Sequence, residues 1–414
     1  MRSDAARLDT GRAAFVLNMD ANGLGVSRSL GWHGIKVVGA DFRPSIAGLR
    51  SRYVRPLLTP DPVKEPEAAA ESLQEAASEM GQRPVLMACS DAYVLLVSRH
   101  RQALSRHFDF STPPESVVES VVNKRMQYEL AERSGIPIPR TMFPRNLSEL
   151  DEVRGDMTYP AFIKPLYSHL WSSRFGNKGF IVNDFQELRS HMTAAFEVGL
   201  EAMVQAIVGE PGRDLYQVCA HIDRQGRASP PFVWRKVRQS PPNFGVASLA
   251  VSEHNDRVQA LGLRFLESIS YRGVGAAEFK YDPEADLYRL IELNCRTWMQ
   301  NAMCTVAGLN LPLIQYADLT DQAPPSAEGF RDGVRWWDGL ADLDSLIRMR
   351  RRGELSTSAW IRSWLGCDCQ AFYSRGDLRP ALKRIGGGVE VMKTLVHALR
   401  RDVDEDAKVT WHRT

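Results

Sequence analysis

The sequence predicts an α/β protein in which a parallel sheet comes first and a mainly antiparallel, α+β region follows. Residues 13–18 and 35–41 are short apolar segments separated by a glycine-containing helical stretch, which is the order of a parallel βαβ unit. Between residues 202 and 294 several segments alternate between apolar and polar side chains, as antiparallel strands do. A length of 414 residues allows two or three domains.

The composition excludes several classes of partner. The chain is 44% hydrophobic and 25% charged, and its net charge of +2 gives no reason to expect nucleic acid or a membrane surface. No apolar run reaches the roughly 18 residues of a membrane span. The N-terminal segment lacks the apolar core of a signal peptide. Six scattered cysteines indicate reduced thiols without a zinc site, and hence a cytoplasmic protein.

The first 118 residues are expected to form a Rossmann-like domain. Further elements are a helix over 66–80, a buried strand over 84–91 and a helix over 93–104. Gly23 and Gly25 suggest a dinucleotide fingerprint, but Arg28 occupies the place of its third glycine. A structural domain that helps to bind substrate is therefore favoured over a nucleotide site.

Three polar residues follow the strands of this domain. Asp41, Ser90 and Asp91 stand at carboxyl ends of predicted parallel strands, where ligand groups gather. They could hold a substrate amine or cap the helices that follow, and the sequence leaves both roles open.

The next segments add a basic residue and a polar loop. A single amphipathic helix is expected over 119–134, and an apolar strand over 159–165 contains Lys164. A lysine within a buried strand is costly unless it meets an anion, so Lys164 is a candidate phosphate ligand, although snorkelling to the surface is the alternative. The loop 166–179 has the polar composition of a phosphate cover or of a plain surface loop.

Alternating segments then continue to a hairpin over 272–297. Lys236 and Arg238 are two apart on a predicted strand and are expected to face the same way. In the hairpin, Glu278 and Glu292 can meet across two strands, with Asn294 on the same face as Glu292. These oxygens suit Mg²⁺. An exposed hairpin with solvated acids is the alternative.

Four motifs in a fixed order carry a family resemblance. They are GIPIPRT (135–141), AFIKP (161–165), RKVRQSPPNFG (235–245) and IELNCR (291–296). With them, the chain from Ala13 to Asp318 resembles the ATP-grasp superfamily of ligases. It looks most like the branch that contains D-aspartate ligase and other carboxylate–amine ligases.

The resemblance implies an ATP-grasp fold with an N-terminal preATP-grasp domain. The domains would be residues 1–118 for the preATP-grasp domain, 119–320 for the ATP-grasp domain and 321–414 for a helical extension packed on the core. Within the ATP-grasp domain, a lid subdomain would cover about 140–205 and a central antiparallel sheet about 206–318.

The resemblance also implies how ATP would be held. Lys124 and Lys164 would bind the phosphates, and Ser172 and Ser173 lie in the loop expected to close over them. The backbone of the hinge, Gln205 to Val208 with Ile207 between, would bind adenine. Asp214 or Glu210 would bind the ribose. The chain departs from the family's pattern in its loop 166–179, which is not glycine-rich, and in Ala206, where an acid is often found.

The remaining implied roles belong to catalysis. Lys236 would reach the γ-phosphate or an acyl phosphate, with Arg238 nearby, and Arg296 would bind a substrate carboxylate. The metal ligands would be Glu278, Glu292 and Asn294, holding one or two Mg²⁺ ions for which Mn²⁺ could substitute.

The implied activity is an ADP-forming ligase that joins a small-molecule carboxylate, activated as an acyl phosphate, to the amine of an amino acid or peptide-like acceptor. A homodimer is the family's usual state. The alternatives are a bicarbonate-activating, carboxylase-like enzyme and a non-catalytic ATP-binding regulatory protein. A more distant alternative is a nicotinamide-dependent oxidoreductase built on residues 13–41.

Overall fold

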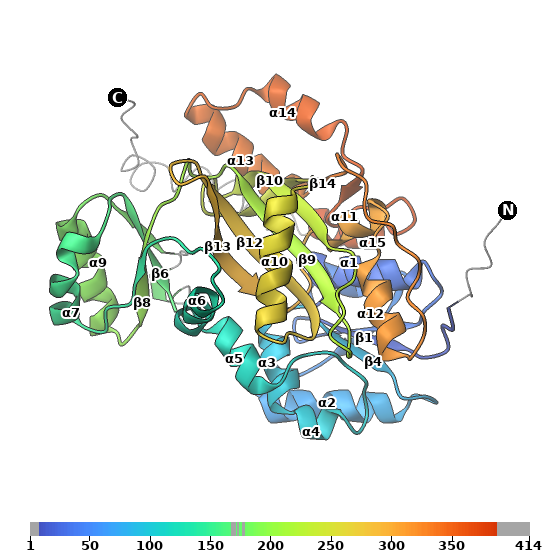
Figure 1. Cartoon of the computed structure of the whole chain (residues 1–414). Helices are drawn as coiled ribbons and strands as arrows, with labels where there is room; N and C mark the ends of the chain where they lie inside the picture. Colours follow the sequence, from blue (N-terminus) through green and yellow to red (C-terminus); the bar gives the residue numbers. More distant parts are fainter. Residues whose placement is uncertain (1–7, 167–170, 172–173, 176–178, 387–414) are drawn as a thin grey trace.

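The computed structural model describes residues 8–166, 171, 174–175 and 179–386. Three sheets organise this part of the chain (Figure 1). The N-terminal sheet lies at one end of the molecule, a small sheet flanked by helices projects at the other, and a large sheet stands between them. Among the described residues, no helix has both the length and the apolar character that crossing a membrane requires.

The N-terminal sheet has four parallel strands in the order β3-β2-β1-β4, which confirms the predicted parallel unit. The strand missing from the prediction is β3, an edge strand interrupted by Pro56 and mostly exposed, so it carries no apolar signal. The bounds of these elements are β1 Ala14–Leu17, α1 Ala21–Gly31, β2 Val37–Asp41, the 3₁₀ helix η1 Ala47–Arg50, β3 Val54–Leu58, α2 Pro66–Ser78, β4 Val85–Ala88, α3 Asp91–Arg99 and α4 Arg101–Leu104.

Two glycines of the first unit serve packing rather than a phosphate turn. Helix α1 begins at Ala21, so Gly23 and Gly25 lie inside it. A Cβ at Gly25 would lie 2.6 Å from Oδ1 of Asn301, and one at Gly23 would lie 2.0 Å from the carbonyl oxygen of Asn18. Glycine is needed at both positions because the helix approaches other parts of the chain too closely for a side chain.

The connection to the next region differs from the single helix predicted over 119–134. Two helices occupy it, α5 (Glu115–Val122) and α6 (Lys124–Arg133). They break at Asn123, whose side chain accepts a hydrogen bond from the N–H of Met126 and so caps α6. The break places Lys124 at the first position of a new helix.

The small sheet is antiparallel, with the order β5-β8-β6-β7, and it lies in the part of the chain where a lid subdomain is expected; its role as a lid stays a prediction. Apolar side chains of its strands and helices form a separate core cluster that includes Ile163, Trp171 and Val204. The bounds are β5 Thr141–Met142, α7 Leu147–Glu152, η2 Arg154–Asp156, β6 Ala161–Pro165, β7 Phe180–Val182, α9 Phe185–Glu197 and β8 Ala202–Ala206.

The large sheet has seven strands in the order β13-β12-β9-β10-β11-β14-β15. Its strand pairs are antiparallel except β14–β15, which is parallel. Helix α10 packs on β9, and Gly262 of the helix allows close contact with Val218 of the strand. The bounds are β9 Leu215–Ile222, β10 Phe232–Ser240, β11 Val246–Ser252, α10 Asp256–Ser268, β12 Gly273–Asp282, β13 Leu287–Asn294, α11 Asn301–Val306 and α12 Leu311–Leu319.

The C-terminal extension is only partly helical, which corrects the prediction of a helical segment over 321–414. Two short strands add to the edge of the large sheet, because β14 pairs with β11 and then with β15. Residues 387–414 lie outside the described part of the chain. The bounds are β14 Arg335–Trp337, α13 Gly339–Arg351, α14 Thr357–Trp364, β15 Cys369–Gln370 and α15 Arg379–Gly386.

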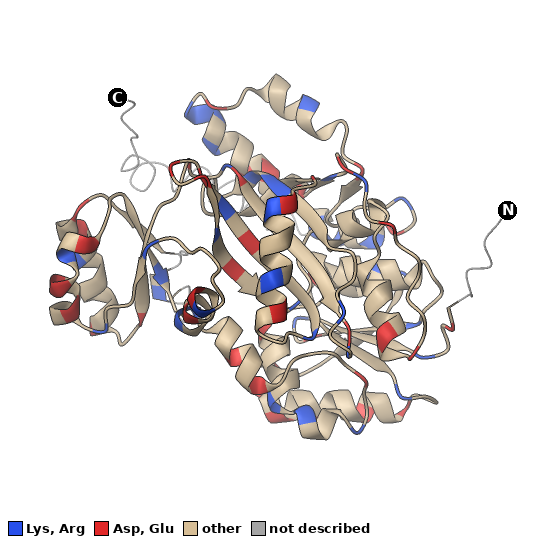
Figure 2. Ribbon diagram, in the orientation of Figure 1, with Lys and Arg blue, Asp and Glu red and all other residues tan. Residues whose placement is uncertain are grey.

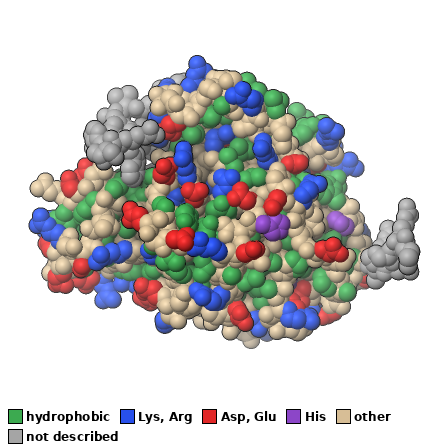
Figure 3. All heavy atoms as spheres, turned by 45° about the horizontal axis from the view of Figure 1, so that its top comes forward, with side chains coloured by type: hydrophobic (Ala, Val, Ile, Leu, Met, Phe, Trp, Pro, Cys, Tyr) green, Lys and Arg blue, Asp and Glu red, His purple; other side chains and the backbone are tan. Residues whose placement is uncertain are grey.

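Charged residues are distributed differently inside and outside. Positions of both signs sit along the central strands of the large sheet (Figure 2), where the core would otherwise favour apolar residues. On the outer face seen in Figure 3, acidic and basic side chains are interspersed with no extended patch of one sign. The charges that need an explanation are therefore the internal ones.

Candidate active site

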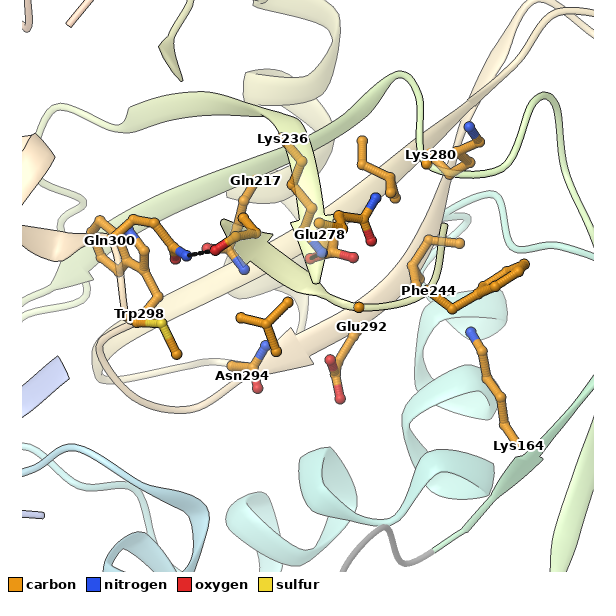
Figure 4. Close-up of a pocket in the computed structure, with 18 of the residues that line it drawn as sticks. Lys164, Gln217, Lys236, Phe244, Glu278, Lys280, Glu292, Asn294, Trp298 and Gln300 are labelled. Carbon is orange, nitrogen blue, oxygen red and sulfur yellow. Dashed lines mark hydrogen bonds and ion pairs between the residues drawn. The ribbon is translucent and has the colours of Figure 1, made fainter. Parts of the chain in front are cut away.

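A cavity of about 520 Å³ lies where the three sheets meet. The carboxyl ends of β1 and β4 line it on one side, β6 and β8 on another, and β10, β12 and β13 form its floor. Figure 4 shows Lys236, Glu278 and Glu292 in its middle, with Lys164 toward one end and Trp298 toward the other. The Lys164 side, with Phe162 and residues 205–208, is called the hinge end. The Trp298 side, with Asp20, Ser90 and Asp91, is called the N-terminal-domain end.

Lys164 occupies the hinge end, and no acidic side chain in the described part of the chain pairs with it. Its ammonium donates to Oε1 of Gln205 at 2.8 Å, and the Gln205 amide donates to the hydroxyl of Thr141 at 2.9 Å. Burial, together with the positive charge of Lys124, lowers the pKa of Lys164 to about 8. The cation is thus held by neutral groups in a place that an anion would stabilise.

The hinge itself lines the cavity as expected, but the two ribose candidates do not. Residues 205–208 border the cavity, and Pro211 and Gly212 follow. Glu210 instead forms an exposed ion pair with Arg213 at 2.9 Å, and Asp214 lies outside the lining with a φ of 49°. The structure therefore brings neither carboxylate into the cavity.

Two ion pairs cross the middle of the cavity. Lys236 Nζ lies 2.8 Å from a Glu278 oxygen, and Lys124 Nζ lies 2.7 Å from a Glu292 oxygen. Glu278 and Glu292 are partners in the β12–β13 register, as the hairpin predicted. Burial alone would raise the pKa of Glu292, but the ammonium of Lys124 outweighs it and lowers that pKa to about 2. The Glu292 carboxylate is therefore ionised at neutral pH.

These two carboxylates and Asn294 fit a hard cation that keeps other ligands. All three residues line the cavity. Within the described part of the chain, no three His, Cys, Asp or Glu residues gather closely enough to hold a metal by themselves. Magnesium commonly takes one or two protein carboxylates and completes its shell with water and phosphate oxygens, so the donor set suits it in the presence of a nucleotide.

Arg296 lies near the N-terminal-domain end and is already paired. Its Nε and Nη2 lie 2.7 and 3.3 Å from the two carboxylate oxygens of Asp91. Burial lowers the pKa of Arg296 but the attraction of Asp91 more than compensates, so that the net pKa is raised. Arg296, which was expected to bind a substrate carboxylate, is thus already bonded to the carboxylate of Asp91 in the N-terminal domain.

Arg238 does not share the face of Lys236, and the expectation that it would is wrong. Strand β10 has a bulge at Val237, where Lys236 pairs with Ala250 and Arg238 with Leu249, so one extra residue reverses the alternation. The guanidinium turns to the other side of the sheet and pairs with Asp342 at 2.7 Å. Arg238 is 7% exposed there and does not line the cavity.

Of the polar residues that follow the strands of the N-terminal sheet, some line the cavity and others only stabilise the fold. The Asp41 carboxylate is buried, accepts from the N–H of Met19 at 2.7 Å and pairs with Arg43, away from the cavity. Ser90 caps α3 and also lines the cavity. Ser172 and Ser173 lie outside the described residues, so their expected contact with phosphates stays a prediction.

No family model matches the chain. It is 26% identical over 310 residues to a D-aspartate ligase of Enterococcus faecium (strain Aus0004), covering 72% of this chain and 74% of that protein. Among solved structures it resembles the ADP complex of an N5-carboxyaminoimidazole ribonucleotide synthetase, PurK (TM-score 0.62, 12% identity, 79% and 82% of the two chains). It also resembles an L-amino acid ligase of Bacillus licheniformis (TM-score 0.57, 14% identity, 75% of each chain).

The chain has the ATP-grasp fold. In this fold the small sheet and the large sheet enclose the cavity between them, and the predicted lysines, carboxylates and hinge reach it from both sides. The predicted resemblance to this superfamily is confirmed.

Sequence reasoning missed several residues of this ATP-grasp cavity. Lys280 was detectable, because it lies two residues after Glu278 on one strand and so shares its face. Phe162 and Phe244 form a stacked pair at a centroid distance of 4.6 Å, and Asp20 and Trp298 line the opposite end. These residues come from separate elements, and no spacing in the sequence links them.

Proposed function

We propose that the chain is an ATP-dependent, ADP-forming ligase that joins a carboxylate to an amine. The observation that carries the proposal is the row of Lys–Glu pairs in the cavity, Lys236–Glu278 and Lys124–Glu292, flanked by Lys164, whose described partner is the neutral Gln205. Phosphoryl transfer depends mainly on positioning and on charge stabilisation, which these residues supply. Similarity to a D-aspartate ligase supports the amide-forming chemistry.

Different residues of the cavity would bind the base, the phosphates and the metal ion of Mg·ATP. The backbone of residues 206–208 borders the hinge end and offers hydrogen-bonding groups for a base. Lys164 and Lys124 supply positive charge for the phosphates. Glu278, Glu292 and Asn294 would hold Mg²⁺, which would supply positive charge to neutralise the phosphates.

The reaction has two steps. An oxygen of the carboxylate substrate attacks the γ-phosphorus, the bond to the bridging oxygen breaks, and ADP leaves. The amine nitrogen then attacks the acyl carbon of the acyl phosphate, a C–N bond forms, and inorganic phosphate leaves as the nitrogen loses a proton. Lys236, in the middle of the cavity, is positioned to stabilise charge on the transferred phosphoryl group.

The test is release of ADP and phosphate from Mg·ATP with amino acids and small carboxylates, singly and in pairs, using D-aspartate first because of the similar ligase. Hydroxylamine in place of the amine would capture an acyl phosphate as a hydroxamate. ADP formation that requires one carboxylate supports the ligase. AMP and pyrophosphate would contradict the acyl-phosphate route, and ADP formation with bicarbonate alone would favour the carboxylase-like alternative.

A further inference from the structure

The charges that line the cavity comprise ion pairs and a few charges without an ion-pair partner. Lys124, Lys236 and Arg296 each have a carboxylate partner within 2.8 Å. Among the described lining residues, the charged side chains without an ion-pair partner are Asp20, Lys164 and Lys280. The position of these three charges divides the cavity into two chemically different ends.

The excess positive charge lies at the hinge end. Lys164 donates to the amide oxygen of Gln205 at 2.8 Å. Lys280 is 5% exposed and donates to the carbonyl oxygens of Glu210 and Arg213. Neutral oxygens orient an ammonium but do not cancel its charge. This end therefore suits the polyanionic nucleotide.

The excess negative charge lies at the other end, on Asp20. One of its carboxylate oxygens accepts from the N–H of Asn22 at 2.9 Å and so caps α1. No described residue donates to its second oxygen. The Asn22 side chain donates to the carbonyl of Thr297 at 2.8 Å, which ties the start of α1 to the segment that precedes Trp298.

Neighbouring cations do not satisfy this carboxylate. The charge of Asp20 acts on Arg43, but the Arg43 guanidinium is bonded to both oxygens of Asp41 and to Asn18. Arg296 is likewise bonded to Asp91. Asp20 thus presents a free, half-buried oxygen to a cavity whose other acids are neutralised.

We propose that the N-terminal-domain end binds the ammonium group of an amino-acid substrate, with Asp20 as its principal acceptor. The inference rests on the proposed ligase function and narrows its carboxylate substrate to amino acids. An ammonium at Asp20 forms a charge-assisted hydrogen bond and restores neutrality at this end. The carboxylate of the same molecule is then directed toward Lys236 and the middle of the cavity. Bicarbonate and simple carboxylic acids lack the group that Asp20 selects.

The experiment compares matched ligands on the full chain by calorimetry in the presence of Mg·ADP. Aspartate, glutamate and alanine, each in both enantiomers, are paired with succinate, glutarate and propionate, which lack the amine. We expect at least one amino acid to bind about 10- to 100-fold more tightly than its partner acid. Asp20→Asn should remove that difference and leave the affinity for Mg·ADP unchanged.

The control variant is Asp184→Asn. Asp184 caps α9 as Asp20 caps α1, accepting from the N–H of Glu187 at 2.9 Å, but it does not line the cavity. Asparagine caps helices about as well as aspartate, so both variants should fold. Asp184→Asn should bind every ligand as the unaltered chain does.

The outcomes separate this proposal from the ligase function. Equal binding of amino acids and their partner acids, no binding of any amino acid, or unchanged selectivity in Asp20→Asn overturns the ammonium site. Turnover of a carboxylate to give ADP would still uphold the ligase in those cases. Conversely, selective, Asp20-dependent binding without any ADP formation supports the ammonium site and overturns the ligase function.

Discussion

Lys236 and Arg238 lie two residues apart on β10, yet they reach opposite faces of the sheet and different surroundings. Lys236 and its partner Glu278 are each 12% exposed and border a cavity. Arg238 and Asp342 are 7% and 0% exposed, and both oxygens of Asp342 are bonded. The indole N–H groups of Trp337 and Trp360 and the hydroxyl of Ser248 also donate to Asp342.

The difference shows what separates a structural ion pair from a functional one. Every acceptor position around Asp342 is filled by protein, so a ligand would find no free group there. Around Glu278 and Glu292 the protein supplies one cation each, and the remaining coordination faces the cavity. Substitutions on the two faces should therefore change different quantities: turnover on the cavity face and folding stability on the other.

The largest effect is expected for Glu292→Gln. The substitution removes a proposed Mg²⁺ ligand and leaves the Lys124 ammonium without its carboxylate. We expect ADP formation to fall by at least about 10³-fold. The thermal midpoint should change little, because the Glu292 side chain is 39% exposed. Glu284→Gln, in the exposed turn of the same hairpin, is the matched control. Retained turnover in Glu292→Gln would exclude the metal assignment.

Asp342→Asn tests the other face. It leaves the buried Arg238 guanidinium without a counter-charge, and breaking such a pair costs about 3–5 kcal/mol of unfolding free energy. Denaturant unfolding measures the loss. Asp332→Asn, which removes an exposed partner of His254, should cost less than about 1 kcal/mol. If the two variants are equally stable, the Asp342 cluster is not structural.

Lys236→Met tests whether the cation on the cavity face of β10 acts in phosphoryl transfer. Losing one stabilising cation should lower the rate of ADP formation by about 10²-fold. Binding of Mg·ADP, followed by calorimetry, should be nearly unchanged, because Lys236 is assigned to the transferred phosphoryl group. Lys64→Met, at an exposed position, provides the control for charge removal. An equal loss of ADP affinity and rate would instead assign Lys236 to ground-state binding.

The sequence predicted the arrangement of the hairpin residues correctly because a period of two relates them directly. Glu278, Glu292 and Asn294 lie on one face once β12 and β13 are paired. The same rule failed for Arg238, because the bulge at Val237 depends on pairing with β11 and on the Asp342 cluster from far along the chain.

Other features were not predictable for the same reason. Strands β14 and β15 have three and two residues, so they depend on an existing sheet edge rather than on their own pattern. Asp20 and Trp298 line one cavity only when the N-terminal domain docks through Asn22, whose side chain donates to the carbonyls of Cys89 and Thr297. Such contacts between distant segments leave no local signal.

The smallest effect concerns the pH dependence of nucleotide binding. The folded pKa of Lys164 is about 8, below its ordinary value of 10.5, so the folded protein loses this proton between pH 7 and 9 while the unfolded chain keeps it. Affinity for Mg·ADP should therefore fall as pH rises through 8, by up to about tenfold by pH 9. Between pH 8 and 10.5 this group makes folding stability rise with pH, because the unfolded chain binds more protons than the folded protein.

Lys164→Met isolates this contribution. The variant should bind Mg·ADP more weakly at pH 7, and its affinity should change less between pH 7 and 9 than that of the unaltered chain. The remaining slope is expected from Lys280, whose pKa burial also lowers to about 8. A slope that Lys164→Met leaves untouched would mean that Lys164 does not contact the phosphates. In that case the cation that binds the phosphates at the hinge end would be Lys280, on the large sheet, and not Lys164, on the small sheet.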